Sequence, residues 1–124
     1  MKELLKGRKF QFWEYRVSHG SLFLRSPMDG KFKTNIDVKF VDVMYVAIPR
    51  FLYEIDIVEP TEAEIKQVKE IVSPPHEISG LYIIKARGRR FPIAGTNMMI
   101  EENELNIMES VFREFRERDA FFNC

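Results

Sequence analysis

The densest group of chemically active side chains in the sequence is basic and surrounds Gly88. Its members are Lys85, Arg87, Arg89 and Arg90. An arginine guanidinium presents a planar fork of N–H donors that matches the oxygens of carboxylates and phosphates. The group therefore fits a phosphate, an acidic protein partner or nucleic acid. It equally fits a solvated turn whose charges keep a strand edge from aggregating.

Binding of nucleic acid fits this basic group less well than binding of a protein. The chain carries 19 basic and 19 acidic residues, so its formal net charge is zero, whereas dedicated nucleic-acid binders are clearly basic. Proteins that bind single strands also interleave aromatic side chains with cations, and only Tyr82 and Phe91 lie near the group in sequence. We therefore expect a protein partner and not nucleic acid.

A second charged group is acidic and contains no cation. Its members are Glu54, Asp56, Glu59, Glu62 and Glu64. It fits a basic partner, or the basic group of a second copy in a homodimer. It also fits the solvent face of a strand followed by the first turn of a helix, where acidic side chains interact favourably with the helix dipole.

Aromatic residues are concentrated in one short run near the N-terminus. They are Phe10, Phe12, Trp13 and Tyr15. In a regular strand, Trp13 and Tyr15 would lie on one face and Phe10 and Phe12 on the other. One face would meet the core, and the other a C-terminal helix or another chain, because aromatic residues dominate interface anchors. Trp13 and Tyr15 therefore join the basic group as predicted partner-binding residues.

No catalytic or cofactor motif is recognisable in the sequence. Ser18 and His19 are adjacent, but a nucleophile and its base are brought together by the fold, and a Gly-x-Ser-x-Gly elbow is absent. The histidines His19 and His76 and the cysteine Cys124 lack metal-ligand spacing, and there is no glycine-rich phosphate loop. We expect no cofactor and no metal, and favour a small protein-binding or accessory module without catalytic activity.

The alternative is an enzyme or small-ligand binder with a pocket in a curved sheet. Its acid–base groups would come from Glu14, Glu54 or Asp56, and its anion-holding groups from Arg16 or Arg25. Paired carboxylates support acid–base chemistry, although any strand with polar alternation carries such pairs. A deep pocket with convergent polar groups would favour this alternative.

The bulk composition indicates one domain spanning 1–124 in a reducing compartment. The length of 124 residues and the 45% apolar content suit a single globular domain. One cysteine cannot form an internal disulfide, which favours the cytoplasm. No apolar run is long enough for a membrane span, and none follows the basic N-terminus as in a secretory signal.

The elements that would position these residues are mainly strands. Alternating or dense apolar residues predict strands over 10–18, 21–25, 35–48 and 53–57, and a hairpin of 80–86 and 90–94 that turns at Arg87-Gly88. Residues 35–48 fit one long bent strand or two strands, and the nearly all-apolar second half is typical of a central strand covered on both faces. The first two strands would form a hairpin around His19-Gly20.

Two helices are expected. Thr61 and Glu64 form a capping-box pattern before an apolar stripe, which predicts a helix over 61–72. Residues 104–118 fit a C-terminal helix or a strand followed by a loop, and the helix is favoured. Strands followed by helices indicate an α+β fold with a mainly antiparallel sheet of six or seven strands. Such a sheet could be open or curl toward a half-barrel, and the sequence pattern leaves both arrangements open.

Overall fold

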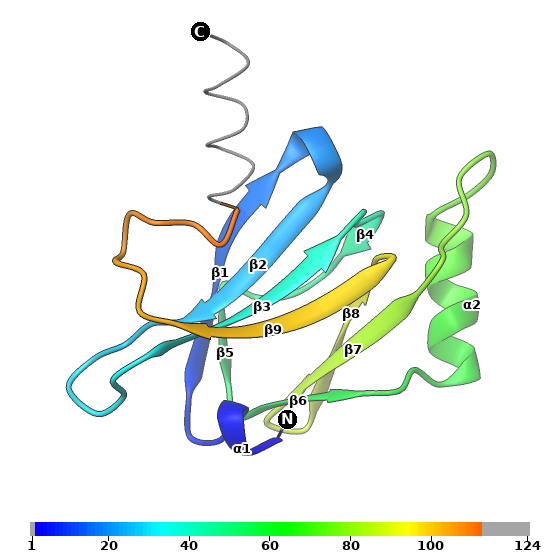
Figure 1. The fold of residues 1–124 in the computed structure, drawn as a ribbon. Helices are drawn as coiled ribbons and strands as arrows, with labels where there is room; N and C mark the ends of the chain where they lie inside the picture. Colours follow the sequence, from blue (N-terminus) through cyan, green and yellow to red (C-terminus); the bar gives the residue numbers. More distant parts are fainter. Residues whose placement is uncertain (1, 113–124) are drawn as a thin grey trace, which may run out of the picture.

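A computed structural model describes residues 2–112, which form an α+β structure dominated by antiparallel strands (Figure 1). The strands are β1 Lys9–Arg16, β2 Ser21–Ser26, β3 Asn35–Val41, β4 Tyr45–Val46, β5 Phe51–Tyr53, β6 Ile55–Val58, β7 Leu81–Ala86, β8 Arg89–Ala94 and β9 Asn97–Asn103. The helical elements are α1 Lys2–Leu5, the 3-10 turn η1 Val17–His19 and α2 Glu62–Ile71. The expected fold class and antiparallel pairing are confirmed.

The strands divide into two sheets that face each other across the core (Figure 1). One sheet has the order β5-β1-β2-β3-β9, and the other has the order β4-β8-β7-β6. Between β5 and β6 the chain passes from the first sheet to the second at Glu54, whose φ of 54° places it in the left-handed region. The single strand expected over 53–57 is therefore two strands, β5 and β6, in different sheets.

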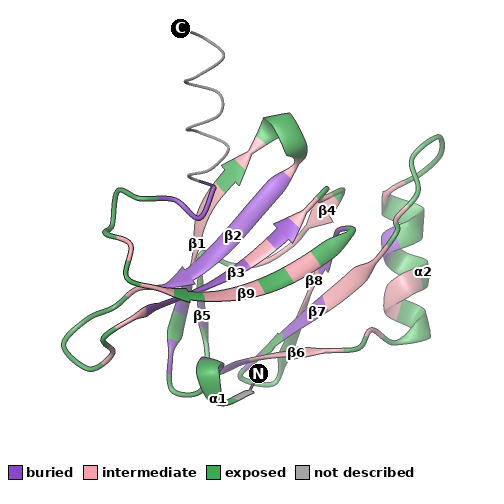
Figure 2. Cartoon of the chain, viewed as in Figure 1, coloured by how far each residue is buried: buried purple, intermediate pink, exposed green. Residues whose placement is uncertain are grey.

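The core lies between the two sheets and is built by alternation along the strands. Leu22 and Leu24 of β2 point inward beside Phe40 and Val38 of β3, because directly paired residues share a face. The second sheet contributes side chains such as Ile84. β2 is buried along its whole length (Figure 2), so its outer face must also be covered.

The segment 104–112 covers that outer face of β2. Phe112 meets Phe23 edge to face, with ring centroids 5.3 Å apart, and Val111 packs beside them. This segment forms turns, so the C-terminal helix is not present over 104–112, and residues 113–118 lie outside the described part of the chain. Asn103, just before this segment, ends β9, a strand that the sequence pattern did not predict.

Helix α2 begins where the sequence predicted. The Thr61 hydroxyl accepts a hydrogen bond from the Glu64 amide at 3.1 Å, and the Glu64 carboxylate accepts one from the Thr61 amide at 2.8 Å. Within α2 only Val68 is buried, and Ile71 remains 50% exposed. The helix therefore rests on the second sheet along a narrow contact.

Two further expectations about strands were wrong. The second half of 35–48 is not a central strand, because β4 has two residues and lies at the edge of its sheet. Trp13 and Tyr15 do not share a face, because a β-bulge between Phe12 and Glu14 shifts the register of β1 against β2. Trp13 packs on the outer cluster around Phe23, and Tyr15 pairs with the inward-facing Leu22.

Candidate functional site

The predicted basic group lies on the β7–β8 hairpin, and strand alternation divides it. Arg87 and Gly88 occupy the turn with φ values of 49° and 79°, as a two-residue hairpin turn requires. Lys85 pairs directly with Arg90, so these two side chains lie on one face of the hairpin. Arg89 pairs with Ala86 and lies on the other face.

Arg90 is held by the start of helix α2. Its Nε and Nη2 donate to the two carboxylate oxygens of Glu64 at 3.0 and 2.9 Å, and Nη2 also donates to the carbonyl of Glu59. The hydrogen bond from Arg90 is the main reason that the pKa of Glu64 falls from 4.5 to about 2, and the same bond raises the pKa of Arg90. Lys85 stands opposite Asp56 of β6. On this face of the hairpin, Arg90 thus supports the fold.

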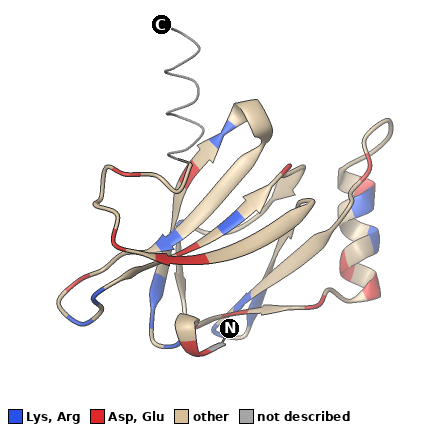
Figure 3. Cartoon of the chain, in the orientation of Figure 1, with Lys and Arg blue, Asp and Glu red and all other residues tan. Residues whose placement is uncertain are grey.

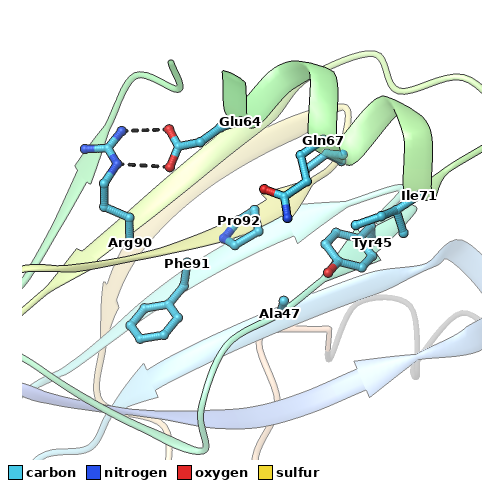
Figure 4. A pocket seen from close by; sticks show the side chains of 9 residues that line it. Tyr45, Ala47, Glu64, Gln67, Ile71, Arg90, Phe91 and Pro92 are labelled. Carbon is cyan, nitrogen blue, oxygen red and sulfur yellow. Dashed lines mark hydrogen bonds and ion pairs between the residues drawn. The ribbon is translucent and has the colours of Figure 1, made fainter. Parts of the chain in front are cut away.

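A pocket of about 310 Å³ opens between α2 and the strands β4 and β8 (Figure 4). The Arg90–Glu64 pair lies at one end, and Tyr45 and Ile71 lie near the other end. The remaining wall includes the apolar residues Ala47, Val68 and Pro92. Gln67 supplies an amide and Tyr45 a hydroxyl, so polar and apolar groups line the pocket together.

The other face of the hairpin meets the edge strand β5. The guanidinium carbon of Arg87 lies 4.4 Å from the ring centre of Tyr53. Arg87 and Arg89 line a groove of about 200 Å³ together with Phe51 and Tyr53. None of the described residues that line this groove is acidic.

Two further cations extend the groove along β5. The Lys9 ammonium lies 5.4 Å, and the Arg50 guanidinium carbon 4.9 Å, from the ring centre of Phe51. We call the set of these six residues the basic groove: Lys9, Arg50, Phe51, Tyr53, Arg87 and Arg89. All six are exposed, and basic residues gather at this end of β1 and of the β7–β8 hairpin (Figure 3).

Sequence reasoning found the two hairpin arginines of the basic groove and missed its other four members. Phe51 and Tyr53 are distant in sequence from Arg87, and only the order of strands brings them together. Aromatic side chains are therefore interleaved with cations in space, although they are not in the sequence. Trp13 and Tyr15 lie elsewhere, since neither lines the groove.

Arg25, which the pocket hypothesis assigned to binding an anion, forms a buried ion pair within the protein. It is 1% exposed, and its Nε and Nη2 donate to the Asp37 carboxylate at 2.7 and 2.9 Å. Its Nη1 donates to the carbonyls of Asn106 and Glu109 at 3.4 and 3.0 Å. The pair therefore fastens the segment 104–112 to the first sheet.

The other charged residues of that hypothesis are dispersed. Arg16 lies 3.5 Å from Glu14, and Glu14 also accepts a hydrogen bond from Ser110. Glu54 and Asp56 line an open depression of about 560 Å³ at the end of the structure near α1. The space between the two sheets is filled with apolar side chains, so the pockets described here lie outside the curved sheets.

Within residues 2–112, no group of three or more His, Cys, Asp or Glu side chains is arranged to hold a metal ion. None of the helices in this part of the chain is long and apolar enough to cross a membrane. No family model, curated protein or solved structure matches the chain.

Proposed function

We propose that this protein is a small cytoplasmic binding module without catalytic activity, and that it binds a protein partner through the basic groove. The observation that carries the proposal is the gathering of four exposed cations around two exposed aromatic rings. The rings of Phe51 and Tyr53 are each 38% exposed. Arginine and aromatic residues are enriched among the anchors of protein interfaces.

The division of the hairpin sharpens this proposal. Arg90 has a carboxylate partner within the fold, whereas Arg87 and Arg89 project to the groove. The binding role predicted for the whole basic group is therefore assigned to Arg87 and Arg89. Arg90 is assigned to the fold, and Lys85 lies beside it on the face away from the groove.

Affinity capture with three matched proteins tests the proposal. Wild type, the double variant Arg87→Ala with Arg89→Ala, and the control Lys66→Ala with Lys69→Ala are immobilised and incubated with lysate of the native cells. The control removes the same charge from the exposed surface of α2. A protein retained in stoichiometric amount by wild type and control, and lost with the groove variant, supports the proposal. Equal retention by all three proteins overturns it.

A homodimer is a special case of the same proposal, and light scattering after size exclusion detects it directly. If the partner is a second copy, wild type will have twice the monomer mass and the groove variant will have the monomer mass. A monomeric wild type excludes this case and leaves binding of a different protein to the capture experiment.

A second candidate function is binding of a small ligand under α2. The pocket of about 310 Å³ supports it, since the volumes of ligand pockets range upward from about 300 Å³. A thermal-shift screen with small apolar compounds tests this function. Compounds that stabilise wild type but not an Ile71→Glu variant would support it, and equal shifts in both proteins would contradict it.

A further inference from the structure

The backbone of β5 presents its outer edge for pairing. Among the described residues, β5 pairs with β1 alone and forms the edge of its sheet. The Phe12 amide donates to the Arg50 carbonyl at 2.9 Å. Because antiparallel pairs alternate between hydrogen-bonded and non-hydrogen-bonded types, Leu52 forms the next bonded pair with Phe10. The backbone groups of Phe51 and Tyr53 consequently point away from β1.

The start of β8 offers a second backbone edge beside the groove. β4 pairs only with the last two residues of β8, Ile93 and Ala94, and the Ala47 amide adds one bond to the Pro92 carbonyl at 3.0 Å. The backbone of Arg90, two residues earlier, points in the same direction as that of Pro92. The chain of β4 has by then left β8 and crossed toward β5 (Figure 1).

The side chains around these edges select the charge of a bound segment. An extended peptide on the edge of β5 would pass the cations of Arg50, Arg87 and Arg89, and no acidic residue lines the groove between them. Carboxylates on alternate residues of the peptide would lie on one face. Guanidinium groups bind such carboxylates through paired N–H donors.

We propose that the partner of the basic groove is an acidic protein segment, which binds in an extended conformation as an added strand on β5. This inference rests on the proposed function and specifies its ligand. Strand addition supplies affinity through main-chain hydrogen bonds, and the groove supplies selectivity for carboxylates. Because β5 has three residues, the added strand makes few hydrogen bonds, and the interaction depends strongly on charge.

The backbone edge distinguishes this ligand from single-stranded nucleic acid. Bases bind to such proteins by stacking on aromatic faces. In the basic groove, Lys9 and Arg50 lie within cation–π distance of the Phe51 ring, and Arg87 lies within that distance of the Tyr53 ring. A base that stacks on either ring would compete with these cations. A peptide pairs with the cations and with the exposed N–H and C=O groups together, and a nucleic acid lacks the alternating backbone donors.

Fluorescence anisotropy with designed peptides tests strand addition. The probe is a short, end-capped, labelled peptide of alternating Glu and Val. Two derivatives carry N-methyl groups on alternate amides. In the first derivative all methyl groups lie on one edge of the extended peptide, and in the second they all lie on the opposite edge. Because one edge faces β5 and the other faces solvent, we expect one derivative to bind about tenfold more weakly and the other to bind as the parent. Equal affinity of the two derivatives overturns strand addition.

Protein variants separate this inference from the proposed function. Arg87→Ala with Arg89→Ala should weaken peptide binding about tenfold at low salt, and the Lys66→Ala with Lys69→Ala control should leave it unchanged. An oligo(dT) probe that binds more tightly than the peptide overturns the inference in favour of nucleic acid. If capture of a protein depends on the groove but the acidic peptide does not bind, the proposed function stands and the acidic-strand inference is wrong.

Discussion

Removing the carboxylate of Asp37 should destabilise the protein more than any surface change. Asp37 is fully buried, and its carboxylate accepts hydrogen bonds from Nε and Nη2 of Arg25. It also accepts a hydrogen bond from Asn103 at 2.8 Å. Truncation to alanine leaves a buried cation without its counter-charge, which costs about 3–5 kcal/mol. A domain of this size has a free energy of unfolding of about 5–15 kcal/mol, so the loss is a large share of it.

Urea denaturation measures this loss. With a slope of about 2 kcal/mol per molar urea, Asp37→Ala should lower the unfolding midpoint by about 2 M. Arg16→Met is the matched control, because Arg16 pairs with Glu14 at 3.5 Å and both side chains are 21% exposed. That variant should cost no more than about 1 kcal/mol.

A double-mutant cycle determines whether the ion pair itself accounts for the effect. Arg25→Met combined with Asp37→Leu replaces both charges with apolar groups, and such replacement of a buried pair is often tolerated. We expect the double variant to be more stable than either single variant, with a coupling energy above about 1 kcal/mol. Additive losses, or a loss below about 1 kcal/mol for Asp37→Ala, would refute the reasoning.

Three further outcomes are expected in the same denaturation assay. The charge of Glu64 stabilises the fold fully above the ordinary pKa of 4.5, and this stabilisation is lost as the pH falls through about 2. Glu64→Gln should therefore lower the free energy of unfolding by about 1 kcal/mol at pH 7. The difference in stability between wild type and variant should shrink toward pH 2, because Arg90 then lacks a charged partner in both proteins. Gly80→Ala should cost about 1–3 kcal/mol, because a Cβ there would lie 2.6 Å from the Gly95 carbonyl oxygen. Phe112→Ala should lower the free energy of unfolding by about 3 kcal/mol and make the segment 104–112 more susceptible to protease, since Phe112 is only 1% exposed. Unchanged stability would show that the segment does not belong to the core.

The features that sequence reasoning predicted correctly depend on residues close together in the chain. The capping box joins Thr61 to a residue three positions later, and the hairpin turn needs only Arg87 and Gly88 in left-handed conformations. Their physical causes are visible in a short stretch of sequence. Antiparallel pairing across the two hairpins follows from the same local turns.

The errors arose where one residue changes the alternation of a strand. The bulge at Trp13 moves Glu14 to the outer face, where its carboxylate accepts a hydrogen bond from Ser110. Glu54 breaks a regular alternating pattern with a positive φ, and it is neither Gly nor Asn, the residues that usually mark this conformation. Neither Trp13 nor Glu54 is a residue type that marks such an irregularity, so the sequence pattern does not reveal it.

Only part of the basic groove was predicted from the sequence, because its residues come from segments that are distant in the chain. Sequence spacing located Arg87 and Arg89, whereas Phe51 joins them only because β5 lies at the edge of its sheet, beside the β7–β8 turn. Arg25 and Asp37 are likewise direct cross-strand partners, and their pairing depends on the register between β2 and β3. Register and sheet order depend on the packing of the whole chain.

The division of the basic group also determines how its variants should be interpreted. A strand places successive side chains on opposite faces, so Arg89 and Arg90 act in different places although they are adjacent. Loss of Arg90 breaks its bidentate bond to Glu64 and weakens the attachment of α2; any effect on binding would then accompany a loss of stability. Loss of Arg89 removes a groove cation, so its effect on binding should appear at unchanged stability. Comparing binding with stability for these two single variants therefore separates the functional face of the hairpin from its structural face.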